Sequence, residues 1–324
     1  MSQPPDRERA KEVISSALGA MERKEGLFEN GPYRPEEAFI DLIKEHSAEI
    51  DDERFLVNTL FLSTSLVFGS DVGNLFDNLS DREAFNKYKY VFDPFLVVCK
   101  DEKDLIVDLV EYIRPGGYQV RAIKQWMHNC QILVNKFHGD TREFFDTYGD
   151  DANILKELLK AKRLLPPEEI PPNYYVPPRI KDKKDFRRYG PKLIALLMQW
   201  IGQYEIYHLK HLDLVGVPAD FHFGAIVLGT GIATIDGEEI AYHRLLHDTA
   251  GPFINEILRE MGVSTKDLSE AFYTIGVLGC NKNAHDRCPI AGYCRKKIIR
   301  DEYDSRGVFS LKTAIDWRTG KKNR

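Results

Sequence analysis

Apolar residues recur at intervals of three and four along most of this chain, and that spacing constrains the fold more than any other feature of the sequence. The clearest stretch is QVRAIKQWMHNCQILVNKF, residues 119–137. Such spacing lines one face of a helix with buried side chains, and no alternating strand pattern of comparable length competes with it. Glycine and proline interrupt the pattern at 29–35, 114–118 and 138–140, as expected where helices end. We therefore predict a mainly α-helical fold.

The composition indicates the size and class of the protein. Its 324 residues, 43% apolar and 29% charged, are enough for one large or two modest domains with a buried core. The stretch MSQPPDRERAKEV is charged where a signal peptide would be apolar, and apolar runs such as 193–201 are too short to cross a bilayer. We expect a cytoplasmic protein that does not enter a membrane, and a monomer.

Three of the five cysteines and one histidine gather in GCNKNAHDRCPIAGYC, residues 279–294. The odd number of cysteines argues against a disulfide framework. Four soft or borderline ligands on one short loop can close around a metal and tie neighbouring helices together. The alternative is a metal-free loop in which the cysteines are merely buried. The spacing Cys-x4-His-x2-Cys-x5-Cys gives a candidate ligand set: Cys280, His285, Cys288 and Cys294.

Two predicted helix starts carry candidate catalytic residues. Gly190 and Pro191 suit the beginning of a helix, which places Lys192 in its first turn. The positive end of a helix disfavours a charged ammonium, and only a neutral amine attacks carbon. Asp220 precedes the apolar segment 221–232, where capping bonds would fix the direction of its carboxylate. The alternatives are a lysine that bends into solvent and an aspartate that only caps.

The order of these parts resembles the helix-hairpin-helix DNA glycosylase superfamily, which includes endonuclease III and the 8-oxoguanine glycosylases. The resemblance rests on the Gly-turn-Lys helix start at 190–192, the V-P-x-D-x-H pattern at 217–222 and the cysteine loop at 279–294. Segments 56–71 and 114–140 resemble an early barrel helix and a later helical region of that family. The likeness covers most of the chain at low identity.

The resemblance implies a DNA base-excision repair N-glycosylase, with or without AP lyase activity, that acts on a damaged base flipped out of the duplex. In this family the lysine attacks the sugar C1′ and the aspartate supports departure of the base. Those roles fall on Lys192 and Asp220. The family's hairpin binds the DNA backbone, and this implies DNA contacts at Arg187, Arg188 and Gly190.

The resemblance also implies two helical domains with a cleft between them. One would be discontinuous, residues 1–50 plus 203–324, and would carry the cysteine loop. The other, 51–202, would be barrel-like, with a Pro-rich insertion at 164–185 and the hairpin at 186–202.

Endonuclease III-like members of the family hold a structural [4Fe–4S] cluster with four cysteines in such a loop. Here a histidine replaces one of the four and the spacing is shorter, so a [4Fe–4S] cluster and a structural zinc ion remain alternatives. Basic residues around the loop could face phosphates or simply be solvated: Lys282, Arg287, Arg295, Lys296 and Lys297.

Departures from the family leave other functions open. The hairpin reads FRRYG at 186–190, where the family usually has L-P-G-x-G, and Ser65 or a neighbour replaces the glutamine that many relatives insert into the duplex. The net charge of −5 gives nucleic-acid binding no support by itself. Two alternatives therefore remain: an N-glycosidic hydrolase of a modified nucleoside, nucleotide or single strand, and a non-catalytic, metal-stapled nucleic-acid-binding module. Three aromatics that could stack on a base are interpreted as core residues: Trp126, Phe272 and Tyr273.

Overall fold

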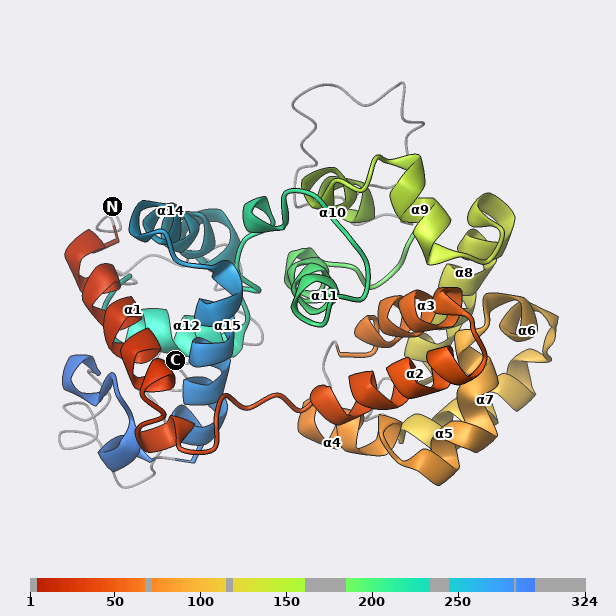
Figure 1. Cartoon of the computed structure of the whole chain (residues 1–324), viewed down its shortest axis with the longest axis horizontal. Helices are drawn as coiled ribbons and strands as arrows, with labels where there is room; N and C mark the ends of the chain where they lie inside the picture. The colour runs from red at the N-terminus through yellow and green to blue at the C-terminus, as the bar shows by residue number, and fades with distance from the viewer. Residues whose placement is uncertain are drawn as a thin grey trace, which may run out of the picture. The chain divides into compact units, whose positions relative to one another are not determined.

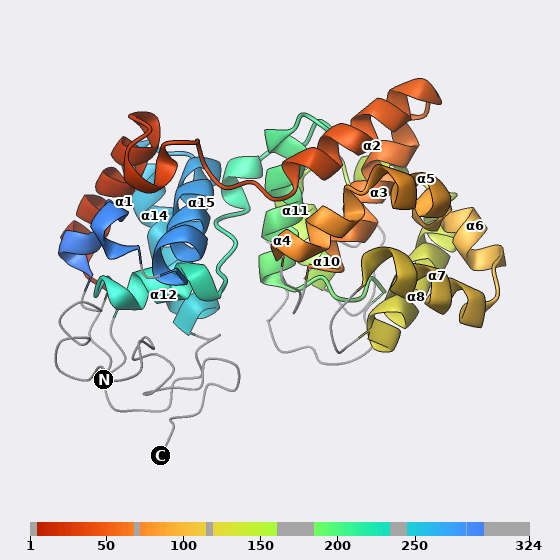
Figure 2. The same ribbon diagram turned by 90° about the horizontal axis from the view of Figure 1, so that it is seen from below.

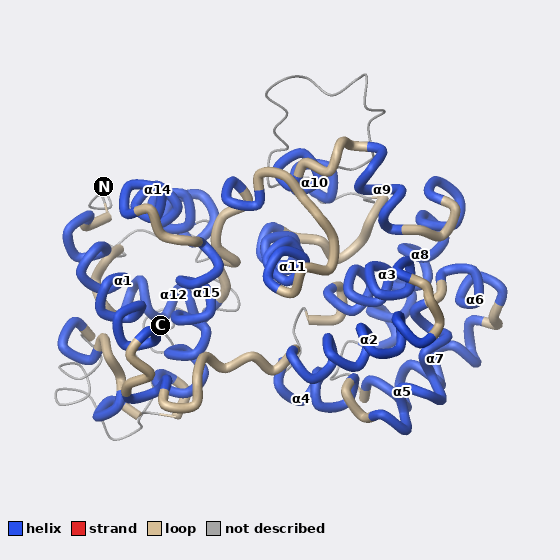
Figure 3. The backbone as a smooth tube through the Cα atoms, in the orientation of Figure 1, coloured by secondary structure: helices blue, strands red, loops and turns tan. Residues whose placement is uncertain are grey.

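The residues that the structure describes fold mainly into helices, which confirms the mainly α-helical prediction (Figure 1). The computed structural model describes residues 5–67, 72–114, 119–160, 185–233, 245–282 and 284–294. Over these ranges the backbone forms helices and loops but no β-strand (Figure 3). None of the described helices is both long enough and apolar enough to span a bilayer. The Pro-rich insertion at 164–185 lies outside the described residues, apart from Asp185.

The helices group into two compact units. The central unit is Arg34–Val215, and the terminal unit combines Met1–Tyr33 with Gly216–Arg324. Residues 34–50 and 203–215, which the sequence interpretation joins to the chain ends, belong to the central unit.

The central unit holds most of the helices. Its α-helices are α2 (Glu37–Glu49), α3 (Glu53–Thr64), α4 (Val72–Leu79), α5 (Arg82–Tyr88), α6 (Pro94–Cys99), α7 (Glu102–Ile113), α8 (Gln119–Phe137), α9 (Thr141–Thr147), α10 (Ala152–Lys160) and α11 (Pro191–Gln203). The described part of this unit also contains the short 3-10 turns η2 (Lys89–Phe92) and η4 (Leu212–Leu214).

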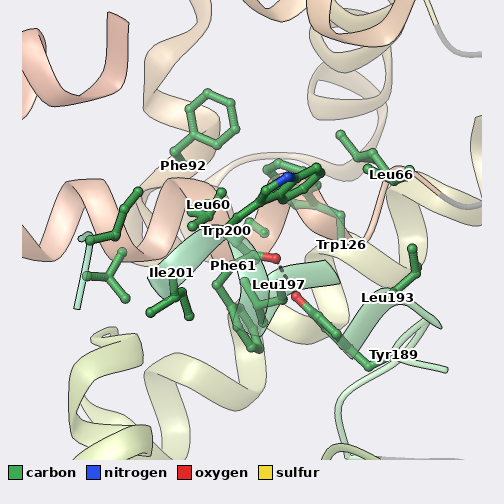
Figure 4. Close-up of a cluster of buried hydrophobic side chains, with 14 of the residues drawn as sticks. Leu60, Phe61, Leu66, Phe92, Trp126, Tyr189, Leu193, Leu197, Trp200 and Ile201 are labelled. Atoms are coloured by element: carbon green, nitrogen blue, oxygen red, sulfur yellow. Dashed lines mark hydrogen bonds between the residues drawn. The ribbon is translucent and has the colours of Figure 1, made fainter. Parts of the chain in front are cut away.

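Helix α3 is the centre of this unit. Every residue from Val57 to Thr64 is buried, as expected of a helix surrounded by others, and α2, α9 and α11 all pack against it. The Phe61 ring stacks on Tyr189 with centroids 4.7 Å apart, and the Tyr189 hydroxyl donates to the Phe61 carbonyl (Figure 4). The Trp126 indole N–H donates to the Val91 carbonyl at 3.1 Å. The polar atoms of Tyr189 and Trp126 are therefore satisfied inside the core.

The terminal unit is built on α1 (Arg7–Glu22), which packs against α14 and α15 (Figure 2). Small and β-branched residues of α1, among them Ala10, Val13 and Ala17, are fully buried there. The other helical segments of this unit are η1 (Gly26–Phe28), α12 (Phe221–Gly229), η5 (Leu245–Ala250), α14 (Gly251–Met261), α15 (Thr265–Thr274), η6 (Ile275–Cys280), η7 (His285–Arg287) and η8 (Ala291–Tyr293). Of these, η5 and η6 are π-helical turns.

Candidate active site

Lys192 lies in the first turn of α11, as predicted. Gly190 is the N-cap, with extended backbone, and Pro191 follows at the first helical position. Gly190 has no side chain, so the N-cap residue makes no side-chain hydrogen bond to the first turn of α11, and Lys192 lies near the positive end of the helix dipole. The lysine is partly exposed. The local fold therefore places a lysine amine in the first turn of α11, where solvent can reach it.

The approach to α11 is fixed by α8. The side chain of Asn129, fully buried, accepts from the Arg187 N–H at 2.7 Å and donates to the Arg187 carbonyl at 3.1 Å. The His128 ring hydrogen-bonds to the Asp185 carbonyl at 2.8 Å. Phe186 and Tyr189 are buried on the same segment. Residues 185–190, which precede the helix that carries Lys192, are thus held in place by hydrogen bonds from α8.

Of the three predicted DNA contacts, Arg188 has a structural role in its own unit. Its Nε donates to the Ser65 carbonyl at 2.7 Å, which places a cation at the C-terminal end of α3, where it is favoured. Ser65 is fully buried and its hydroxyl donates to the Leu62 carbonyl at 2.7 Å, so it cannot be inserted into a duplex. Arg187 and Gly190 are partly exposed, and DNA contact by these residues stays a prediction.

Asp220 is the N-cap of α12. Its carboxylate accepts from the Phe223 N–H at 3.0 Å, and it is partly exposed. Capping alone does not single it out, because aspartate is the usual cap in this chain, as at Asp6, Asp52, Asp81, Asp93, Asp101 and Asp140. Asp220 differs from these other caps in the group of aromatic side chains that lies beside its helix start.

An aromatic row that the sequence interpretation did not assign to the site lies beside the first turn of α12. The His222 ring, 7% exposed as a residue, packs edge-on against Tyr273 at 5.3 Å, and Tyr273 stacks on Tyr33 at 5.9 Å. Trp126 and Phe272 are core residues, as predicted, whereas Tyr273 is only partly buried. The V-P-x-D-x-H pattern is the only sequence signal that pointed to His222.

Lys192 belongs to the central unit and Asp220 to the terminal unit. A cleft that brings the two side chains together stays a prediction.

The four candidate metal ligands share one loop at the end of α15 and η6. Backbone bonds shape it: the Ala284 N–H donates to the Gly279 carbonyl at 3.0 Å and the Cys294 N–H to the Ala291 carbonyl at 3.1 Å. All four residues are partly exposed. Among the described residues, no three histidine, cysteine or acidic side chains are grouped as a metal site. The predicted metal is therefore supported by the donor types and their spacing alone.

The loop is fastened to the N-terminal part of the terminal unit. Arg287 donates to the Gly26 carbonyl at 2.7 Å and pairs with Glu29 at 2.8 Å. The Arg9 guanidinium lies over the Tyr293 ring, 5.5 Å from its centroid. Among the basic residues around the loop, Arg287 is thus engaged within the protein, while Arg295, Lys296 and Lys297 lie outside the described residues.

Comparison with models of known protein families and with curated protein sequences gave no match.

Proposed function

We propose that the protein is a DNA base-excision N-glycosylase that also has AP lyase activity. The observation that carries the proposal is the Asp220 carboxylate, which is fixed by the Phe223 N–H, partly exposed, and two residues from a buried histidine. A fixed anion of this kind stabilises a positive charge that develops on a sugar. Lys192, in the first turn of α11, supplies the second group that this chemistry needs.

In the proposed reaction a damaged base leaves the stack, because its glycosidic bond is inaccessible within the duplex. The C1′–N bond breaks, the base departs with the bonding electrons, and Asp220 stabilises the cationic sugar. The nitrogen lone pair of Lys192 then forms a bond to C1′, the nitrogen loses its protons, and cleavage of the C1′–O4′ bond with protonation of O4′ gives a Schiff base. Removal of a C2′ proton and departure of the 3′ phosphate with the C3′–O bonding electrons cleave the strand, and water hydrolyses the Schiff base to release the lysine.

The Asp220→Asn variant tests the role of the carboxylate. Asparagine caps a helix about as well as aspartate, so the unfolding free energy stays within about 0.5 kcal/mol of wild type. Base release falls by at least about 100-fold if the charge is catalytic. Asp6→Asn, which makes the same change at the cap of α1 in the same unit, is the matched control. Unchanged base release in Asp220→Asn leaves only a cap, and favours the non-catalytic binding module.

A substrate other than duplex DNA has specific support. Arg188 is engaged by the Ser65 carbonyl, Ser65 is buried, and the chain carries a net charge of −5. These features favour an N-glycosidic hydrolase of a modified nucleoside, nucleotide or single strand. Affinity for duplex DNA measured against salt separates the two, because several phosphate contacts give a steep dependence and a nucleoside site gives almost none.

We also propose a structural metal centre held by Cys280, His285, Cys288 and Cys294. Three thiolates and an imidazole suit zinc or an iron–sulfur cluster, and either would tie the end of η6 to η7 and η8. Metal analysis and the visible spectrum of the purified protein distinguish the two. Cys288→Ser should lose the metal, whereas Cys99→Ser, at an exposed cysteine on α6, should retain it. Wild-type protein that holds no metal after anaerobic purification contradicts this proposal.

A further inference from the structure

The ring of His222 lies directly against the backbone of η6. A Cβ placed on Gly276 would come within 2.5 Å of the His222 Cβ and 2.6 Å of its Nδ1. Real Cβ atoms do not approach other atoms so closely, so any residue larger than glycine at 276 must displace the histidine. The close approach of α12 to η6 thus depends on both residues.

Tyr273 and the π-helical turn complete the contacts around the His222 ring. The Tyr273 and His222 rings meet at 86°, an edge-on contact that limits how far the imidazole can turn. Tyr273 is held in turn by Tyr33, whose N–H donates to Thr274 Oγ1 at 2.8 Å. The turn itself is closed by the bond from the Asn281 N–H to the Gly276 carbonyl at 3.0 Å, a separation of five residues that is typical of a π turn. Turns of the π type occur often at functional sites.

The contacts of the His222 ring are coupled to the Asp220 carboxylate through the first turn of α12. The bond between the Asp220 carboxylate and the Phe223 N–H spans His222, so a shift of the His222 backbone moves the amide that fixes the carboxylate. The Asp220 carbonyl also accepts from the Gly224 N–H at 2.9 Å, which closes the same turn.

We propose that His222 is a positioning residue: its ring, seated on Gly276 and Tyr273, fixes the first turn of α12 and so the direction of the Asp220 carboxylate. This inference rests on the proposed function for its catalytic consequence. Its structural part, the coupling of the ring to the cap, holds for any reaction at Asp220.

Kinetics test the catalytic consequence. Displacement of a catalytic group by about 1 Å costs on the order of 100-fold in rate, so Gly276→Ala and His222→Ala should lower kcat for base release by about that factor with little change in KM. His222→Phe keeps a flat ring of similar size and should recover most of the rate. Val227→Ala, a fully buried change at the other end of α12, controls for lost packing. A loss in His222→Ala no larger than in Val227→Ala, or no recovery in His222→Phe, overturns the proposal.

A double-mutant cycle tests the coupling without any substrate. Asp220→Ala, His222→Ala and the double variant are unfolded in urea, with Asp220→Ala and Val227→Ala as the matched pair. If the His222 ring positions the Asp220 cap, the losses of unfolding free energy from the changes at 220 and 222 are non-additive, because loss of the ring already weakens the capping bond. Additive effects overturn the inference. Coupling in a protein that releases no base from any substrate rejects the proposed function and keeps the inference.

Discussion

Replacement of Asn129 by alanine should loosen the segment that leads to Lys192. The buried Asn129 amide makes a two-way contact with the Arg187 backbone, at 2.7 Å and 3.1 Å. Each such hydrogen bond contributes about 0.5–1.5 kcal/mol net, and the backbone groups left behind are only partly reached by water. We therefore expect Asn129→Ala to lower the unfolding free energy of the central unit by about 2 kcal/mol.

Urea denaturation followed by tryptophan fluorescence measures this loss, because Trp126 and Trp200 are both buried in the central unit. Gln131→Ala is the matched control, since it removes an exposed amide from the same helix and should change the unfolding free energy by less than about 0.5 kcal/mol. Equal stability of the Asn129→Ala and Gln131→Ala variants would refute the reasoning that α8 fixes residues 185–190.

Two further predictions concern stability. Gly26 and Gly31 both have positive φ, but a Cβ on Gly26 would lie 2.3 Å from the Arg287 carbonyl oxygen, whereas one on Gly31 would meet nothing within 4 Å. Gly26→Ala should therefore lower the unfolding free energy, measured by urea denaturation, by about 1–3 kcal/mol more than Gly31→Ala. Equal losses would mean that the cysteine loop is not docked against Gly26. Burial alone would raise the pKa of Asp108, but the hydrogen bond from Lys100 at 2.7 Å helps to lower that pKa below its usual value. The carboxylate therefore stabilises the fold at neutral pH, and this stabilisation is lost as the pH falls through the folded-state pKa. The stability difference between wild type and Asp108→Asn should shrink from pH 7 to about pH 3, and a constant difference would contradict it.

Features set by local sequence were predictable. The three- and four-residue spacing identified helices because it records which face is buried, and Gly190 with Pro191 gave the start of α11 because these residues suit an N-terminus for backbone reasons alone. Asp220 was predicted as a cap for the same reason.

Features set by tertiary packing were not predictable. Nothing near Gly276 in the sequence indicates that the His222 ring rests on it, because the contact joins two separate helical segments. The sequence predicts a phosphate contact at Arg188, but it does not indicate the positive φ of 70° or the bond to the Ser65 carbonyl, which depend on where α3 ends. The spacing of Cys280 and His285 identifies donor types, but the direction of each side chain depends on the turns η7 and η8.

Borohydride trapping on abasic DNA tests the central claim most directly, because it requires a lysine amine to reach the sugar C1′. The account predicts a covalent adduct with wild-type protein and none with Lys192→Ala, while Lys156→Ala, which removes a lysine bonded to the Val215 carbonyl, still forms the adduct. An adduct of equal yield with Lys192→Ala would assign the chemistry to another amine. No adduct with wild-type protein on duplex or single-stranded abasic DNA would contradict the lyase mechanism.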